Sequence, residues 1–286
     1  MNFATRRKIL DFIRYSVLVV VAMVMLYPLA WMVVSIWREN HEIFTSSGLI
    51  VQNPANGLEN IRMGWETRLA HNLGFYFLNT LRFLLPRVIG QIVSCVLTAY
   101  AITRFQFKGK KIVFSLVIAT LLMPDVIFRI PMFILYRDLG LLGTFLPLWL
   151  DTAFATGSFF VFMLVQFMRT IPKELDEAAK IDGCNSFQTL TQILLPVMKP
   201  AVITVGLLTF MWGMNDFMGP AIYIRDSARW PLQLALRQAS DMSGEGGLVW
   251  GEIFAMSTIA LLPAIILFFV AQKFFIEGIA STGSKE

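Results

Sequence analysis

Residues 169–199 read RTIPKELDEAAKIDGCNSFQTLTQILLPVMK, a charged segment that lies between two stretches apolar enough to cross a bilayer. Pro172 suits the first turn of a helix, because the N–H that it lacks has no partner there. Glu174, Asp176 and Glu177 then lie near the positive end of the helix dipole, which favours carboxylates. The first half of the segment therefore predicts a short helix in water, where it is available to a partner.

The second half of the segment predicts a turn and another short helix. Gly183 suits the left-handed residue that ends a helix, because it has no Cβ. Asn185 can cap the next helix, and Gln188 stands three residues on, where a capping-box partner belongs. Leu194, Leu195 and Pro196 end this helix before Lys199 leads into the next apolar run.

An alternative is that the segment lies on lipid headgroups as an amphipathic loop. The residues disfavour this alternative, because Glu174, Asp176 and Glu177 suit an anionic membrane surface poorly. We therefore expect the segment to contact a protein in the water.

Three short strings follow one another in the segment: Glu177-Ala178-Ala179, Asp182-Gly183 and Ile193-Leu194-Leu195-Pro196. In this order and between two membrane spans, they resemble the EAA loop of permease subunits in ABC importers. In that family the loop forms a coupling helix that sits in a cleft of a separate ATPase subunit. The ATPase-coupling residues implied by the resemblance are Glu174, Glu177, Ala178, Ala179, Asp182 and Gly183.

The composition is that of a membrane protein. Apolar residues make up 56% of the chain and charged residues 15%, against about 25% charged residues in soluble domains. Residues 15–37 carry no charge, and about 20 apolar residues cross the hydrocarbon core. A signal peptide is the alternative for this stretch, but its apolar core is too long and no small-residue cleavage site follows. We expect one transmembrane permease domain over residues 1–286, with the loop 169–199 within it.

We expect an all-α integral membrane protein with six transmembrane helices, and the resemblance implies the type I ABC importer permease fold. After the first span, the others are predicted at residues 79–103, 112–136, 145–168, 200–217 and 253–272. An ion-coupled secondary transporter is the alternative, but such proteins usually contain internal repeats and broken helices. The sequence shows no second copy of any segment and no paired interruptions.

Lysine and arginine gather in short loops, and this bias sets orientation. With six spans, all the clusters fall on one side: Arg6, Arg7, Lys8 and Arg14; Arg104, Lys108, Lys110 and Lys111; Arg169, Lys173, Lys180 and Lys199; Lys273 and Lys285. We therefore expect cytoplasmic N- and C-termini and a cytoplasmic loop 169–199. The net charge of +5 follows from this bias, so it does not indicate a nucleic-acid partner, which would need a basic soluble face.

The chain shows no constellation for catalysis, a metal or a cofactor. His41 and His71 are its only histidines, and they fit no set with metal-ligand spacing. Cys95 and Cys184 lie in different parts of the predicted topology, so no disulfide is expected. The tail 278–285 superficially resembles a phosphate-binding loop, but serine precedes lysine and no helix follows. A membrane enzyme is therefore disfavoured, and ATP hydrolysis requires a separate subunit.

Further strings extend the resemblance to nearly the whole chain. They are Asn79-Thr80, Ala99-Tyr100-Ala101 with Arg104 and Gly109-Lys110, Met123-Pro124, Ile130-Pro131, Leu139-Gly140-Leu141, Trp212 near Asn215 and Pro220, and Gln272-Lys273 before Gly278. They are similar to the carbohydrate-uptake branch, and within it to the smaller permease of the maltose-transporter type. The chain departs from that family in its tail, which reads Thr-Gly-Ser-Lys-Glu instead of Gly-Ala-Val-Lys-Gly, and in holding Asp125 and Arg129 within the third span.

The resemblance implies the partners. A second, different permease subunit, two ATPase subunits and an extracytoplasmic solute-binding protein would assemble with this chain in the lipid bilayer of the bacterial inner membrane. The external loop Ser243, Gly244, Glu245, Gly246 and Gly247 corresponds to the loop that reaches the sugar cleft of the binding protein in the maltose system. A plain Gly-rich turn is the alternative for this loop.

Ionisable groups within spans are costly and tend to face a cavity or a partner. The possible substrate pathway comprises Arg82, Arg87, Asp125, Arg129, Trp212 and Asn215. One hypothesis is a positive lining for an acidic saccharide, because guanidinium groups bind carboxylates through two hydrogen bonds. Alternatively, Arg129 pairs with Asp125 one turn away and Arg82 extends to the outer headgroups. The solute is then a neutral oligosaccharide or a non-sugar compound.

Overall fold

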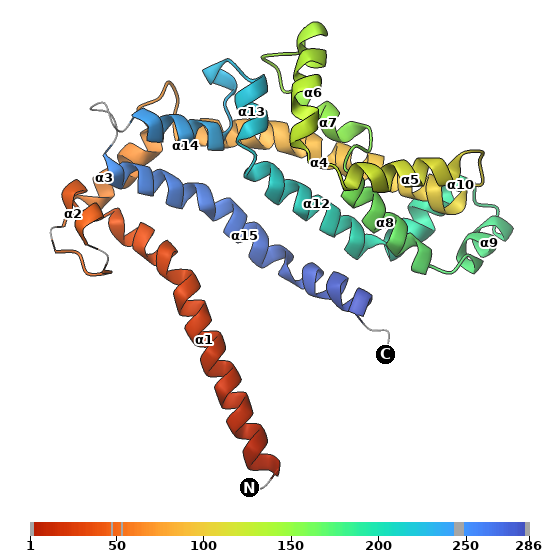
Figure 1. Ribbon diagram of the computed structural model, residues 1–286, viewed down its shortest axis with the longest axis horizontal. Coiled ribbons are helices and arrows are strands. Elements are labelled where there is room, and N and C mark those ends of the chain that lie inside the picture. The colour runs from red at the N-terminus through yellow and green to blue at the C-terminus, as the bar shows by residue number, and fades with distance from the viewer. Residues whose placement is uncertain (1–2, 47, 53, 243–248, 284–286) are drawn as a thin grey trace. The chain divides into compact units, whose positions relative to one another are not determined.

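The computed structural model is all helical over the residues that it describes, 3–46, 48–52, 54–242 and 249–283 (Figure 1). Its α-helices are α1 (Phe3–Ser35), α2 (Asn40–Thr45), α3 (Gly57–Glu66), α4 (Leu73–Arg104), α5 (Lys110–Leu121), α6 (Val126–Asp138), α7 (Leu146–Ala153), α8 (Ser158–Thr170), α9 (Glu174–Ile181), α10 (Ser186–Gln188), α11 (Leu195–Val197), α12 (Lys199–Met214), α13 (Met218–Tyr223), α14 (Leu232–Asp241) and α15 (Trp250–Gly283). The chain divides into two compact units. Unit 1 comprises Met1–Phe75 and Ala235–Leu262, and unit 2 comprises Tyr76–Leu234 and Pro263–Glu286.

Four segments of the described chain are long and apolar enough to cross a membrane: Arg7–Ser35, Leu73–Arg104, Leu146–Thr170 and Trp250–Val270. Two further candidates are helix pairs with a sharp bend, and counting each pair as one span gives up to six. The all-helical fold predicted from the sequence is confirmed, and six predicted spans agree with the upper count.

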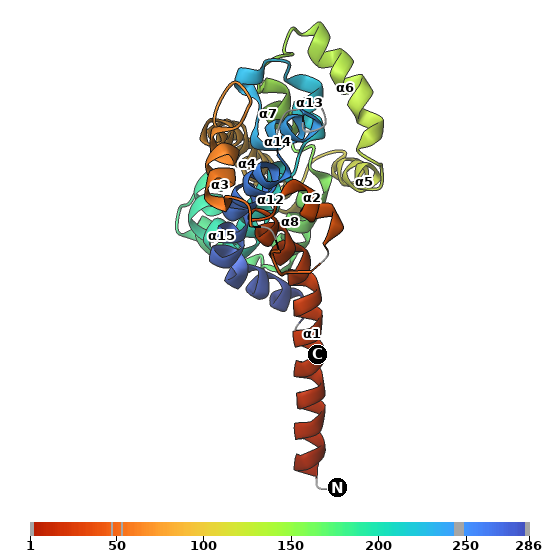
Figure 2. The ribbon, with the colours of Figure 1, turned by 90° about the vertical axis from the view of Figure 1, so that its left-hand side faces the viewer.

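The third predicted span, residues 112–136, is wrong as a single helix. It consists of α5 and α6, whose axes differ by 106°, and the turn between them is visible in Figure 2. Pro124 lies in the break. Proline lacks an N–H and disfavours a helical conformation in the residue before it, here Met123. The expectation of no interruptions therefore fails at this point.

A second sharp bend lies just before the predicted fifth span, residues 200–217. The helical segment Ser186–Val197 meets α12 at 81°. Pro200 is the second residue of α12, a position in the first helical turn where proline costs no hydrogen bond. A new helix therefore starts here, close to the predicted start of the span.

The core of unit 2 is built by α4, α8 and α12. Ala99 of α4, Leu164 and Val165 of α8, and Val205 of α12 are completely buried. Small and branched apolar side chains at the contact allow close packing of the helices. These helices form the frame that positions the functional residues.

Near the N-terminus of α4, the residues Asn79 and Thr80 hold a neighbouring segment by hydrogen bonds. The Asn79 amide donates hydrogen bonds to the carbonyl oxygens of Ala228 and Trp230, at 3.0 and 3.1 Å. The Leu232 N–H donates to the Thr80 hydroxyl at 2.8 Å. Both side chains are buried, so they fix the segment that leads into α14.

In unit 1, a buried arginine organises the segment after α1. The Arg38 side chain is completely buried and donates to the carbonyl oxygens of Ser46 and Ile50, each at 3.2 Å, and to that of Gly48. Its Nε lies 3.8 Å from Glu42. The sequence analysis did not single out this residue, because a cation just after a span looks like an ordinary flanking charge.

Substituting Arg38→Met is expected to destabilise unit 1. The carbonyl oxygens of Ser46 and Ile50 lose their donor and Glu42 loses its cation, and breaking a buried pair costs about 3–5 kcal/mol. Thermal unfolding of the purified chain in detergent measures the effect. Arg62→Met is the matched control, because the Arg62 side chain is exposed beside Glu59 and Glu66. Equal unfolding midpoints for the two variants would contradict the assigned role of Arg38.

Candidate functional site

The first helix predicted in the charged segment is present as α9. Glu174, Asp176 and Glu177 occupy its first turn, as the dipole argument requires. Pro172 departs from the prediction, because it precedes the N-cap residue Lys173 and lies outside the helix. Gly183 has a φ of +85°, which confirms the left-handed turn.

The second helix begins with the predicted capping box. The Asn185 side chain accepts from the Gln188 N–H at 2.9 Å, and the Gln188 side chain accepts from the Asn185 N–H at 2.8 Å. The helix then continues through a π-helical segment, Thr189–Leu194. No sequence signal predicted this segment. Pro196, which cannot donate to a carbonyl in the preceding turn, follows it.

Three contacts fasten the loop to the end of α4. Arg104 Nε lies 2.9 Å from the Asp176 carboxylate, and Arg104 Nη2 donates to the Ile171 carbonyl at 3.0 Å. The Tyr100 hydroxyl donates to the Ser186 carbonyl at 2.9 Å. The loop is therefore attached to its own subunit on both sides of the Gly183 turn.

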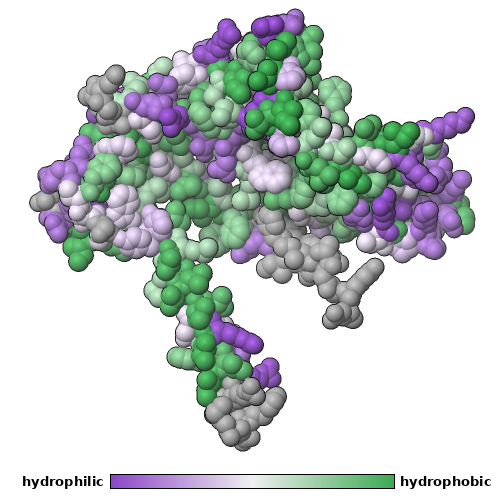
Figure 3. Space-filling view, viewed as in Figure 1, coloured by the Kyte–Doolittle hydropathy of each residue, from purple (hydrophilic) through white to green (hydrophobic). Residues whose placement is uncertain are grey.

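The outer surface of the loop combines charge with exposed apolar side chains. Ile181 is 86% exposed and Phe187 is 68% exposed. The end of unit 2 formed by α9 and α10 is otherwise largely hydrophilic on the face shown in Figure 3. These two side chains are the large apolar groups that the outer surface of the loop offers to a partner.

The predicted coupling residues do not all lie on this surface. Glu174, Glu177, Ala178, Asp182 and Gly183 are exposed.

Ala179, in contrast, is 3% exposed. Its carbonyl accepts from the Cys184 N–H at 2.9 Å and so closes the turn. The structure therefore differs from the expectation that Ala179 faces a partner. Its small side chain lets α9 approach the body of unit 2.

Arg87 is part of an ion cluster. Its guanidinium lies 2.9 Å from Asp216, which follows α12, and 3.5 Å from Asp151 of α7. The Thr152 hydroxyl also donates to the Arg87 carbonyl at 3.1 Å. Asp216 in turn accepts from the Gly219 N–H at 2.9 Å. Arg87 is therefore neutralised by carboxylates of its own subunit, which weakens the hypothesis of a positive lining.

The sequence analysis missed Asp151 and Asp216. Both lie in or next to predicted spans, so the cost of ionised groups in a membrane applies to them as it does to Arg87. Asp216 directly follows Asn215, which was already among the candidates.

The other two predicted arginines, Arg82 and Arg129, form no ion pair with the carboxylates that bind Arg87 in the described part of the chain. Arg82 is exposed and donates to the Asn79 side chain at 3.0 Å. Within the described part of the chain, Asp125 and Arg129 form no ion pair with each other, so the predicted pairing at one helical turn is wrong. Asp125 is the N-cap residue of α6 and has helical backbone angles, φ −55° and ψ −28°. The helical spacing to Arg129 is therefore present, and the two side chains nevertheless do not pair.

Trp212 and Asn215 lie at the end of α12. The Trp212 indole is 54% exposed, and its ring centroid lies 5.1 Å from that of Phe160 and 5.9 Å from that of Phe159. The exposed Asn215 side chain donates to the Met211 carbonyl at 2.9 Å. Trp212 and Phe159 therefore form a partly open aromatic surface over the buried ring of Phe160.

The comparisons with known proteins identify the family. Residues 91–280 match the family described as "Binding-protein-dependent transport system inner membrane component". The chain belongs to this family of transport permeases. The permease is 33% identical over 266 residues to the probable ABC transporter permease protein YurM of Bacillus subtilis (strain 168), covering 91% of this chain and 83% of YurM.

Other relatives of this permease carry names of transport systems. It is 26% identical to the diacetylchitobiose uptake system permease protein NgcG of Streptomyces coelicolor, covering 95% of this chain and 88% of NgcG. It is 25% identical to the sn-glycerol-3-phosphate transport system permease protein UgpE of Yersinia pestis, covering 96% of this chain and 98% of UgpE. The fold matches, with a TM-score of 0.80 and 21% identity, a chain of a bacterial ABC transporter involved in the import of the acidic polysaccharide alginate. That match covers 96% of this chain and 99% of the other.

The family decides between the alternatives left by the sequence. The protein is a permease component of a binding-protein-dependent importer in the inner membrane and works with other subunits. It is neither an ion-coupled secondary transporter nor a catalyst by itself. The predicted binding-protein contact loop, residues 243–247, lies outside the residues that the structure describes.

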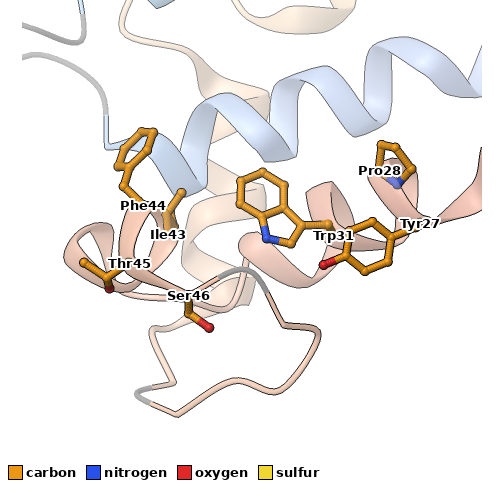
Figure 4. Close-up of a pocket in the computed structure, with 7 residues that line it drawn as sticks. All are labelled: Tyr27, Pro28, Trp31, Ile43, Phe44, Thr45 and Ser46. Atoms are coloured by element: carbon orange, nitrogen blue, oxygen red, sulfur yellow. The ribbon is translucent and has the colours of Figure 1, made fainter. Parts of the chain in front are cut away.

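Unit 1 of the permease holds a separate cavity of about 510 Å³ (Figure 4). The side chains that line it are Tyr27, Pro28, Trp31, Ile43, Phe44, Thr45 and Ser46. None of them is charged, so the cavity offers no counter-ion for an acidic ligand.

Proposed function

We propose that this permease forms half of the translocation pathway of an ATP-driven saccharide importer. A second, different permease subunit supplies the other half. Two copies of an ATPase subunit dock on the cytoplasmic side, one of them on the loop 169–199, and an extracytoplasmic binding protein delivers the solute. Both termini lie in the cytoplasm, and the chain acts as one permease domain.

The observation that carries the docking proposal is the exposed surface of α9 and its turn. Ile181 and Phe187 project from a loop that is fastened to α4 on its other side. Apolar side chains surrounded by charged ones suit the centre of a protein interface with a polar rim. The carboxylates of Glu174, Glu177 and Asp182 belong to that rim.

The docking proposal predicts that Ile181→Asp uncouples the transporter. Its side chain is 86% exposed, so the chain should fold normally, while a charge at the centre of the contact costs about 2 kcal/mol or more of docking energy. Uptake by vesicles that contain the assembled complex, binding protein and ATP is expected to fall at least about tenfold.

Ile50→Asp is the matched control for this experiment. Ile50 is 80% exposed and belongs to unit 1, outside the loop. Full ATP-driven uptake by the Ile181→Asp complex would remove the docking assignment. Transport by vesicles that hold this chain without any ATPase would remove the importer mechanism itself.

The saccharide proposal rests on the aromatic surface and on the relatives. The partly open face of Trp212 beside Phe159 suits the apolar face of a sugar ring, because both rings present flat apolar surface and the indole adds an N–H donor. NgcG is named for a disaccharide and the structural neighbour for alginate import. UgpE is named for a phosphorylated glycerol, which keeps a non-sugar solute as the competing outcome.

The charge balance around Arg87 favours a neutral solute over an acidic one. Asp151 and Asp216 compensate the guanidinium. Of the three arginines in the proposed positive lining, this leaves Arg82 and Arg129, which form no ion pair in the part of the chain that the structure describes. Identification of the ligand that copurifies with the binding protein tests this directly. A uronide oligomer would reverse the charge argument, and a non-sugar compound would remove the saccharide assignment while leaving the importer intact.

A further inference from the structure

A polar cavity of about 550 Å³ lies in unit 2 where three candidate membrane helices end. Arg104, the last residue of α4, Lys110, the first residue of α5, and Thr170, the last residue of α8, all line it. These helices are candidate spans by length and composition, and basic side chains at the ends of such helices suit the headgroup level of a membrane. We therefore take the cavity to lie near the boundary between membrane and water.

The cavity is strongly basic. Its ionisable lining comprises Arg104, Lys110, Arg169, Lys173 and one acid, Glu174. The charge of Arg104 is neutralised by its ion pair with Asp176 of the loop. The other three cations form no ion pair with a carboxylate in the part of the chain that the structure describes.

Two of these cations are held in place with donors to spare. The Lys110 ammonium donates one hydrogen bond, to the Phe105 carbonyl at 2.9 Å, and an ammonium has three donors. The Arg169 guanidinium lies 4.7 Å from the centroid of the Phe114 ring. Stacking on a ring face leaves the in-plane N–H groups of arginine available to an anion. The cavity therefore presents fixed, unneutralised donors.

We propose that this cavity binds the phosphate group of an anionic phospholipid from the surrounding leaflet. Arginine binds phosphate oxygens through two parallel hydrogen bonds, and basic pockets between membrane helices on the cytoplasmic side suit lipid headgroups. The position of the cavity at the membrane boundary favours a lipid over a soluble anion. Lys173 and Glu174 start α9, so a bound headgroup touches the loop proposed to dock the ATPase.

The test measures lipid binding to the full-length chain, purified in a mild detergent, by native mass spectrometry. Phosphatidylglycerol is titrated against phosphatidylcholine for the wild type and for Lys110→Gln/Arg169→Gln. Loss of one basic group near a membrane surface corresponds to about fivefold in lipid affinity, so the double substitution is expected to weaken phosphatidylglycerol binding about 25-fold. Phosphatidylcholine binding should not change.

Lys108→Gln/Lys111→Gln is the matched control. It removes the same charge from the same loop at two exposed residues that do not line the cavity. Equal weakening in both double variants would show a general surface-charge effect and overturn the proposal, as would unchanged binding in the cavity variant. Competition by millimolar inorganic phosphate would assign the cavity to a soluble anion instead.

A second measurement separates lipid binding from protein docking. Phosphatidylglycerol is expected to raise the unfolding midpoint of the wild type and of the control, and to have little effect on the cavity variant. A cavity variant that binds phosphatidylglycerol normally but fails to retain the ATPase subunit would assign the basic cavity to the protein interface. The solute and the uptake assay play no part in either measurement, so the result stands apart from the proposed function.

Discussion

Replacing Gly183 by valine is expected to reduce ATP-driven uptake about tenfold or more, while the protein accumulates at a normal level. Gly183 has a φ of +85°, and a left-handed conformation costs an L residue about 1–2 kcal/mol, with more for a β-branched side chain. No atom lies within 4 Å of a Cβ built there. The substitution therefore acts through the backbone alone, by displacing Ile181 and Phe187 from the geometry proposed for docking.

Two further variants make the Gly183 experiment specific. Gly183→Asn should retain most of the uptake, because asparagine tolerates the left-handed region. Gly140→Val imposes comparable strain, at a φ of +67° and with equally open surroundings, on a different loop. It is expected to lower stability slightly without uncoupling transport. If Gly183→Val transported as well as the wild type, the turn would have no part in coupling.

The second large effect is expected at the ion cluster of unit 2. In Arg87→Gln, Asp216 and Asp151 face each other without a cation, and removing one partner of a buried pair costs about 3 kcal/mol or more. The Arg87 and Asp216 side chains are 17% and 21% exposed, whereas Asp151 is 56% exposed. The expected loss therefore comes mainly from the pair with Asp216. Thermal unfolding of the purified chain measures it.

The double substitution Arg87→Gln/Asp216→Asn distinguishes a charge effect from simple loss of packing. It removes the uncompensated carboxylate and leaves two neutral amides, so it should recover most of the lost stability. Asp151→Asn alone should change the midpoint little, because water already screens this exposed carboxylate. Equal midpoints for the single Arg87 variant and the double variant would show that the ion pair is not what stabilises this region.

The local structure of the loop 169–199 was largely predictable because its signals are local. Gly183 as the left-handed residue and Asn185 with Gln188 as a capping box depend on a few neighbouring residues, and the structure contains both. The burial of Ala179 was not predictable in the same way. It depends on how α9 lies against the rest of unit 2, which no residue spacing specifies.

Contacts between residues far apart in the sequence were not predictable either. The sequence marked Arg87 as costly in a membrane, but its partners come from segments 64 and 129 residues away along the chain. The expected pair between Arg129 and Asp125 shows that helical spacing alone does not specify an ion pair, because both residues lie after the break at Pro124. The break itself was indicated in the sequence by the string Met123-Pro124.

The helix α4 makes polar contacts near both of its ends. Near its C-terminus, Arg104 and Tyr100 bind the loop 169–199. Near its N-terminus, Asn79 and Thr80 form hydrogen bonds with the segment that leads into α14. A helix of 32 residues is about 48 Å long. One continuous helix therefore connects the loop 169–199 to residues 228–232, and Pro86, which lacks a backbone donor, is the place along it where a bend would be easiest.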